Sequence, residues 1–168
     1  MANRYYLFSD ADGTTLETTL SNSGFLYYCK TVETKIACTK ITTVGYYKNI
    51  NALTITSAHA YIKCSADSTA NNATKCTYLT NPTAGGSCTN IGDIISATQA
   101  GSAETTYSLC IASASPAISI DLSTTGQYFV DVNGDTSAFG KKEGYYVLVV
   151  FDGENALLSP PGKKIYNT

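Results

Sequence analysis

Charge is scarce in this sequence. Only 14% of its 168 residues are Asp, Glu, Lys or Arg, against roughly 25% in an average soluble protein. Arg4 is the single arginine, and the formal net charge is −2. Proteins that bind nucleic acid normally show a basic balance and clustered Arg. The composition therefore excludes nucleic acid as an expected partner.

Several other features are also missing. No apolar run approaches the 18 or more residues that would span a bilayer, so we predict no membrane span. There is no Gly-x-Ser-x-Gly elbow, no His-Glu-x-x-His helix and no glycine-rich phosphate loop. With His59 as the only histidine, a His-rich ligand set is impossible. The acidic residues fit a solvated surface, so we predict a non-catalytic protein without a cofactor.

Two acidic turns begin like metal loops and then depart from the pattern. In Asp131-Val132-Asn133-Gly134-Asp135, the sixth position is Thr136 instead of Gly and the twelfth is Lys142 instead of a carboxylate. A hairpin turn explains these residues without calcium. Asp10-Ala11-Asp12-Gly13 is interpreted in the same way, as a turn before the next strand. We predict no metal site.

Cysteine is present in an even number, and no pair has the Cys-x-x-Cys spacing of a zinc or redox site. Local loop closure predicts three disulfides, whose partners are Cys29–Cys38, Cys64–Cys76 and Cys88–Cys110. The alternative is six buried thiols in a cytosolic protein. Because the cysteines stand among Thr, Ser, Lys and Ala, we favour disulfides and an extracellular, secreted location.

The two ends of the sequence resemble the interior of a longer protein. Met1-Ala2-Asn3-Arg4 leads directly into an aromatic run without a signal peptide. The last residues, from Ile165 on, resemble the start of another strand. We therefore expect a piece of a longer extracellular chain. Asn72-Ala73-Thr74 is a candidate N-glycosylation site.

Strand patterns dominate the sequence. Runs of Tyr, Phe, Val, Ile and Thr are bounded by turn residues, and Asn133-Gly134 and Asp152-Gly153 carry hairpin signals. The expected strands are Tyr5–Ser9, Thr14–Thr19, Gly24–Lys30, Gly45–Asn49, Ala52–Ser57, Ala60–Cys64, Ser108–Ala112, Ala117–Leu122, Gln127–Val132, Tyr145–Phe151 and Ala156–Ser159. Helical periodicity occurs only in Ile91–Ala100. The predicted class is all-β.

The interval 65–105 differs in composition, being dense in Ala, Ser, Thr, Asn and Gly. Alone it would be interpreted as a disordered linker. Because Cys64, Cys76, Cys88 and Cys110 punctuate it, we expect a long polar loop region pinned by disulfides. Residues 1–168 are accordingly predicted to form a single domain.

Aromatic pairs recur with gaps of about 17 to 22 residues in part of the chain. They are Tyr5-Tyr6, Tyr27-Tyr28, Tyr46-Tyr47, Tyr128-Phe129 and Tyr145-Tyr146. Such a period fits stacked β units of about 20 residues, either hairpin repeats or coils of a β-solenoid. An antiparallel β-sandwich is the alternative.

The tyrosines also predict a binding surface. Neighbouring side chains on a strand point to opposite faces, so each pair should direct one ring outward. Exposed tyrosines are common at protein interfaces. The candidate binding residues are Tyr46, Tyr47, Tyr128, Phe129, Tyr145 and Tyr146. The alternative is that these rings are only cross-strand fillers.

One stretch resembles a known family. Gly45-Tyr46-Tyr47-Lys48-Asn49, followed by Tyr61-Ile62-Lys63-Cys64 and then Cys76, is similar to repeats in the scaffoldins of anaerobic-fungal cellulosomes; Gly24–Cys38 and Gly144–Ser159 are looser copies. The resemblance implies a cohesin-like module that binds the dockerin domains of plant-cell-wall-degrading enzymes. The alternatives are a carbohydrate-binding module that uses exposed Tyr rings, and a structural wall or adhesin repeat.

Overall fold

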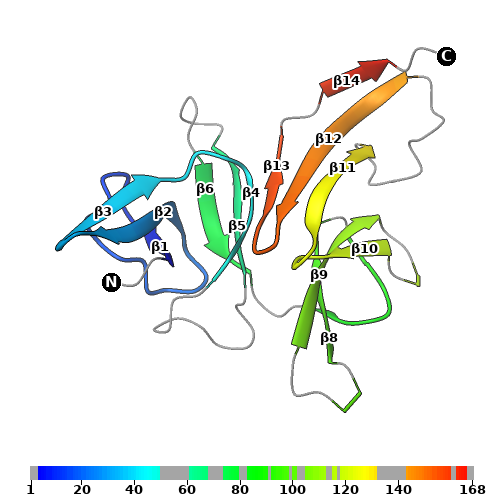
Figure 1. Cartoon of the computed structure of the whole chain (residues 1–168), viewed down its shortest axis with the longest axis horizontal. Coiled ribbons are helices and arrows are strands. Elements are labelled where there is room, and N and C mark those ends of the chain that lie inside the picture. Colours follow the sequence, from blue (N-terminus) through cyan, green and yellow to red (C-terminus); the bar gives the residue numbers. More distant parts are fainter. Residues whose placement is uncertain are drawn as a thin grey trace. The chain divides into compact units, whose positions relative to one another are not determined.

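The computed structural model describes residues 4–49, 61–67, 74–79, 83–90, 92–98, 100–101, 105–112, 115–116, 118–131, 143–159 and 162–165. These residues form strands and turns, with no helix among them (Figure 1). The all-β prediction is confirmed. By its internal contacts the chain divides into two compact units, Met1–Asn81 and Pro82–Thr168. The single-domain interpretation of the whole chain stays a prediction.

The first unit is built from antiparallel strands. Its strands are β1 (Arg4–Phe8), β2 (Ser23–Val32), β3 (Lys35–Lys40), β4 (Gly45–Lys48), β5 (Tyr61–Ala66) and β6 (Thr74–Tyr78). They are hydrogen-bonded in the order β1-β2-β6-β5-β4, and β3 pairs with β2. β2 is therefore the strand on which the unit is organised, because β1, β3 and β6 all pair with it.

The second unit contains eight strands among its described residues. They are β7 (Thr83–Ala84), β8 (Ile94–Thr98), β9 (Thr105–Ala112), β10 (Ile118–Asp121), β11 (Thr125–Asp131), β12 (Glu143–Asp152), β13 (Ala156–Leu158) and β14 (Gly162–Ile165). One sheet has the order β10-β9-β8-β7, in which β7 and β8 are parallel. In the other, β11, β13 and β14 each pair antiparallel with β12.

The aromatic pairs mark strands of this fold. All five pairs lie in a strand: β1, β2, β4, β11 and β12 respectively. Consecutive strands such as β1 and β2 pair antiparallel, with Tyr5 opposite Tyr28 and Tyr6 opposite Tyr27. Antiparallel pairing fits hairpin repeats, since successive coils of a solenoid would pair in parallel.

Three expectations from the sequence are corrected. Within the segment Ile91–Ala100, which had the only helical periodicity, Ile94–Thr98 forms the strand β8, paired with β9, and the side chains of Ile94 and Ile95 are buried. The interval 65–105 is not a loop throughout, since it contains β6, β7 and β8. Thr14–Thr19 is not a strand; only Leu16 forms a bridge, to Phe8.

One further expected turn is confirmed, and two other expected elements lie outside the described residues. The hairpin at Asp152-Gly153 joins β12 to β13, and the Asp152 carboxylate accepts hydrogen bonds from the backbone N–H groups of Glu154 and Asn155. The expected strand Ala52–Ser57 and the turn Asn133-Gly134 lie outside the described residues, although β11 and β12 do pair antiparallel.

All three predicted disulfides are confirmed. Cys29 and Cys38 face each other across β2 and β3, and Cys64 and Cys76 across β5 and β6, each with a Cα–Cα distance of 4.0 Å. In an antiparallel ladder, the closer Cα atoms belong to the pairs that do not exchange backbone hydrogen bonds. Both disulfides therefore bridge strands at the positions where the backbones approach most closely.

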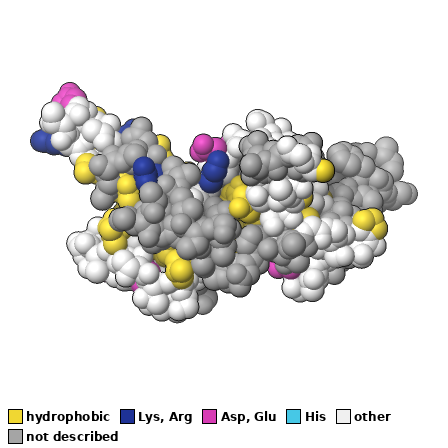
Figure 2. All heavy atoms as spheres, turned by 90° about the horizontal axis from the view of Figure 1, so that it is seen from below, with side chains coloured by type: hydrophobic (Ala, Val, Ile, Leu, Met, Phe, Trp, Pro, Cys, Tyr) yellow, Lys and Arg dark blue, Asp and Glu magenta, His cyan; other side chains and the backbone are white. Residues whose placement is uncertain are grey.

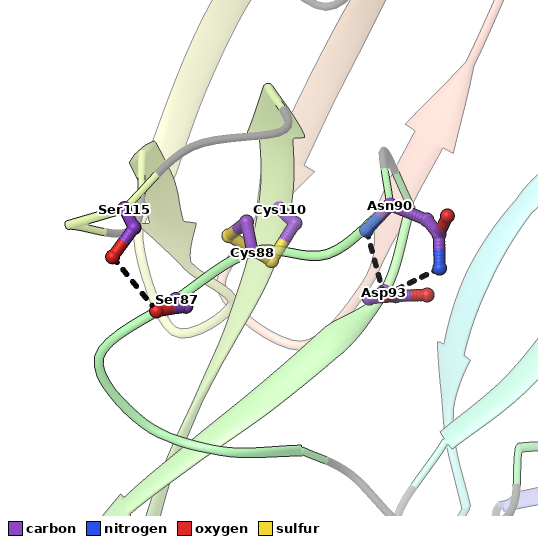
Figure 3. The surroundings of a disulfide bond; sticks show 6 residues. All are labelled: Ser87, Cys88, Asn90, Asp93, Cys110 and Ser115. Carbon is purple, nitrogen blue, oxygen red and sulfur yellow. Dashed lines mark hydrogen bonds between the residues drawn. A yellow bond between two sulfur atoms is a disulfide. The ribbon is translucent and has the colours of Figure 1, made fainter.

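The third disulfide ties a loop of the second unit to a strand (Figure 3). Cys88 lies in the loop, Cys110 lies on β9, and both are buried with Ile95. The same loop is closed by Asn90, whose backbone N–H and side-chain amide donate to the Asp93 carboxylate at 3.0 and 3.2 Å. The Asp93 carbonyl in turn accepts a hydrogen bond from the Cys110 N–H.

Burial predicts where the first unit is most sensitive to substitution. Leu26 on β2 is fully buried, whereas Ile36 on β3 is 52% exposed. We expect Leu26→Ala to lower the free energy of unfolding by about 2 to 5 kcal/mol, because it leaves a cavity. The matched variant Ile36→Ala should cost less than about 0.5 kcal/mol. Urea unfolding of both variants tests this, and equal losses would contradict the assigned core.

Candidate functional site

The most exposed strand of the first unit belongs to a hairpin formed by β2 and β3, which we call the arm (residues 27–40). The two strands pair from Tyr27 opposite Lys40 to Val32 opposite Lys35, and they meet at the pointed end on the left of Figure 1. Residues 30–39 are all exposed. In Figure 2, acidic and basic side chains gather at this left-hand end. The arm thus leaves the core and enters solvent.

Apolar side chains lie on both faces of the arm. Val32 is 47% exposed and Ile36 is 52% exposed. Because opposite residues in a ladder share a face and neighbours along a strand alternate, Ile36 shares the face of the Cys29–Cys38 disulfide, and Val32 lies on the other. A hairpin that covered a core would bury one of these faces. Among the described residues of the arm, each face therefore carries one exposed large apolar side chain.

The turn at the end of the arm lacks the usual hairpin sequence. Glu33 and Thr34 alone join Val32 to Lys35, and Glu33 has a φ of 55°. Two-residue hairpins favour Asn-Gly or Asp-Gly at such positions, so the sequence analysis missed β3. The spacing of Cys29 and Cys38, which are 9 residues apart, could have indicated β3, since a short segment between two cysteines suits a disulfide-linked hairpin.

The base of the arm is held by the loop that follows β1. The Asp10 carboxylate accepts hydrogen bonds from the backbone N–H groups of Asp12 at 3.0 Å, Thr14 at 3.0 Å and Thr15 at 2.7 Å. This turn presents the carbonyl oxygen of Ala11, which accepts hydrogen bonds from the Tyr27 hydroxyl at 2.5 Å and the Lys40 ammonium at 3.3 Å. The turn predicted at Asp10–Gly13 is therefore confirmed, and it anchors both strands of the arm.

Close packing makes a glycine necessary in this loop. Gly13 has a φ of 69°, and a Cβ added there would lie 3.1 Å from the ring of Tyr27. The Tyr27 ring also packs edge-on against Phe8, with centroids 5.2 Å apart. Desolvation, reinforced by the negative charges of Asp12 and Asp10, raises the pKa of the Tyr27 hydroxyl. The hydroxyl is thus kept as a neutral hydrogen-bond donor to Ala11.

Cations cover a further ring at the base of the arm. The Nζ atoms of Lys40 and Lys75 lie 4.3 and 4.0 Å from the centroid of the Phe25 ring. Ammonium groups at this distance are attracted to the face of an aromatic ring. Lys40 is thereby used twice for structure, by Phe25 and by Ala11. Lys30 and Lys35, farther out on the arm, are exposed.

The structure describes the side chains of only one of the three aromatic pairs that were predicted to place a ring in solvent. Tyr46 and Tyr47 are 4% and 3% exposed, so for this pair the prediction of a solvent-facing ring is wrong. Tyr47 packs on Tyr5, which packs on Tyr28, with centroids 5.2 and 5.1 Å apart. The rings of this pair therefore fill space within the fold, as the alternative interpretation held.

The remaining candidate residues stay untested. Tyr128, Phe129, Tyr145 and Tyr146 lie on β11 and β12, but their side chains are outside the described part of the structure. Asn72 also lies outside the described residues. Their roles stay predictions.

The described residues show neither a metal-binding cluster nor a membrane-spanning helix. Among them, no three or more His, Cys, Asp or Glu side chains group in a way that could hold a metal ion. The described residues also contain no helix long and apolar enough to cross a membrane. Three disulfides in a chain of this size are compatible with an extracellular protein.

Comparisons with known proteins identify no relative: no family model, no curated protein and no solved structure matches the chain. The resemblance to fungal scaffoldin repeats therefore stays a prediction, and any function must be argued from the chain itself.

The hydrogen bonds in the loop at the base of the arm should make the Asp10 carboxyl group unusually acidic. Its backbone hydrogen bonds, chiefly from Thr14 and Thr15, lower the pKa of Asp10 from 3.8 to about 2. Because the folded pKa is the lower one, the stabilising contribution is present above pH 3.8 and is lost as the pH falls toward 2. An NMR titration should show the Asp10 carboxyl and the Thr15 amide shifting with a common midpoint near 2. A midpoint near 3.8 would contradict these bonds.

The disulfide of the arm gives a second prediction. Cys29→Ala/Cys38→Ala should lower the free energy of unfolding of the first unit by about 2 to 3 kcal/mol, because a short loop is no longer closed in the unfolded chain. The amides of Ala37 and Thr39 should also exchange faster with solvent. The control, Cys88→Ala/Cys110→Ala, removes the disulfide of the other unit and should leave these two amides unchanged. Unchanged exchange in the first variant would mean that the disulfide does not hold the arm.

Proposed function

We propose that the chain is a non-catalytic, extracellular protein-binding module whose docking surface is the arm. One observation carries this proposal: a hairpin linked by a disulfide exposes Val32 and Ile36 on its two faces. Ordering a contact segment at folding avoids part of the entropy cost of ordering it at association. The three disulfides support an oxidising, extracellular setting.

Dockerin domains of secreted plant-cell-wall-degrading enzymes are the first partners to test. The support for them is the resemblance of Gly45–Cys76 to fungal scaffoldin repeats, together with an exposed arm able to contact a compact domain. In this proposal Val32 and Ile36 supply the apolar centre of the contact. Lys30 and Lys35 form its charged rim, in keeping with the polar rims of protein interfaces.

Carbohydrate binding receives less support from the described tyrosines. Stacking of a sugar needs an exposed ring face, whereas Tyr46 and Tyr47 are nearly fully buried. An assay of both functions separates the candidates: the immobilised chain is exposed to dockerin-bearing fungal enzymes, and the free chain to cellulose and xylan. Retention on polysaccharide without a protein partner would contradict the proposal. Two empty assays would favour a structural wall or adhesin repeat.

Substitutions on the arm test the docking surface directly. Val32→Ser/Ile36→Ser should weaken binding of a dockerin-bearing enzyme by about ten-fold or more, because it removes the apolar contact. The matched control is Leu16→Ser, since Leu16 is the other large exposed apolar residue described, at 37% exposure, and lies outside the arm. Titration calorimetry measures both variants, with circular dichroism as a check on folding. Equal affinities of the arm variant and the parent would move the site away from the arm.

A further inference from the structure

The outer edge of β3 has a defined set of backbone groups directed away from β2. The Ile41 N–H donates to the Leu26 carbonyl at 2.8 Å, which fixes the phase of the ladder. In antiparallel pairs the hydrogen-bonded positions occur at every second residue, so Thr39, Ala37 and Lys35 bond to β2. The N–H and C=O groups of Ile36, Cys38 and Lys40 therefore point outward. Within the described residues, β2 is the only strand that pairs with β3.

The strands β1 and β3, which both pair with β2, differ in the hydrogen bonding of their outer sides. The outer side of β1 is covered at its C-terminal end by the segment that follows it: the Ser9 N–H donates to the Thr15 carbonyl and the Glu17 N–H to the Leu7 carbonyl, both at 2.9 Å. No such segment covers β3 in the described part of the chain, and residues 35–39 are exposed. An edge of this kind can accept another strand.

The positive charges near the outer edge of β3 favour an added strand with acidic side chains. Lys30 and Lys35 share the face of Val32 and Ala37, and both are exposed. Glu33, in the turn, is the one acidic residue of the arm, which carries three lysines. An added strand with Asp or Glu on that face would place carboxylates near the two ammonium groups. A second copy of β3 would instead bring lysines together, which is unfavourable.

We propose that the outer edge of β3 binds an extended acidic segment of the partner protein as an additional strand. This inference rests on the proposed protein-binding function and specifies how the partner is held. The segment would exchange backbone hydrogen bonds with Ile36, Cys38 and Lys40, and about five of its residues would pair along the edge. The side chains of Val32 and Ile36 then lie on the two faces beside it.

Amide exchange in the free protein tests the premise. The amides of Ile36, Cys38 and Lys40 should exchange quickly, whereas those of Ala37 and Thr39 should be protected by their bonds to β2. The opposite pattern would mean that the ladder has the other phase, which would overturn the proposal.

Peptide selection tests the occupant. A displayed library of random dodecapeptides, selected on the whole chain, should yield sequences in which Asp or Glu alternates with β-branched residues. A synthetic peptide of such a sequence should bind and slow exchange at Ile36, Cys38 and Lys40. Enrichment without acidic residues, or binding that leaves these amides unchanged, would overturn the proposal. Slowed exchange that depends on protein concentration without peptide would show pairing between two copies, and would also overturn it.

Two matched comparisons separate backbone pairing from side-chain contact. Ile36→Pro removes an outward N–H, and Ile36→Ala keeps it, so the proline variant should bind the selected peptide about ten-fold more weakly than the alanine variant. Protection of Ala37 and Thr39 confirms that the arm stays folded. Lys30→Gln/Lys35→Gln should weaken binding, unlike Lys48→Gln on β4. Equal affinity of the proline and alanine variants would overturn strand addition.

The failure of this inference is distinguishable from the failure of the proposed function. If Val32→Ser/Ile36→Ser abolishes binding of a dockerin-bearing enzyme while Ile36→Pro and Ile36→Ala bind it equally, the arm docks the partner by its side chains and the added strand is refuted. If neither set of variants affects the enzyme, the arm is not the docking surface at all.

Discussion

The pairing of β3 with β2 is the interaction on which the geometry of the arm depends. Its phase, set by the Ile41–Leu26 hydrogen bond, places Cys29 and Cys38 at a closely spaced position where a disulfide can form. The same phase turns the backbone groups of Ile36, Cys38 and Lys40 to the outer edge. A shift by one residue would exchange both the faces and the outward groups. The position of the disulfide and the set of outward backbone groups on β3 thus both follow from the phase of the same strand pairing.

In this chain, which has few charges, individual charged side chains hold a loop through hydrogen bonds with backbone groups. One exposed carboxylate, Asp10, organises a whole turn, and the carbonyl of Ala11 that this turn presents accepts donors from both strands of the arm. Lys40 serves the ring of Phe25 as well. The lysines farther out are left for contacts with solvent or a partner. The distribution of charge therefore separates a structural base from an available tip.

Strand alternation alone predicts that one ring of each tyrosine pair faces solvent, but the described rings are used mainly for packing. In the first unit, the rings of Tyr5, Tyr28 and Tyr47 pack on one another. They act as large fillers with a polar end, and tryptophan is absent from the chain. Among the large apolar side chains that the structure describes, the exposed ones are aliphatic: Val32, Ile36 and Leu16. The proposed docking surface, which consists of aliphatic groups and an open strand edge, would suit a polypeptide better than a sugar ring.

The sequence by itself determined the properties that act over short distances: the all-β class, the three disulfides and most strands rich in Tyr, Val and Ile. Strand β3 escaped prediction because Lys and Ala, which are depleted in strands, make up three of the six residues of Lys35–Lys40. Strand β6 (Thr74–Tyr78) escaped prediction because it lies in the polar interval 65–105, which was interpreted as a loop. Ile91–Ala100 was misinterpreted because a short apolar run fits either period. Only the tertiary structure decided which rings are buried and which edge is open. Both depend on which strands, distant in sequence, come to pair, and β2 acquires its neighbours from β1, β3 and β6 only when the chain folds.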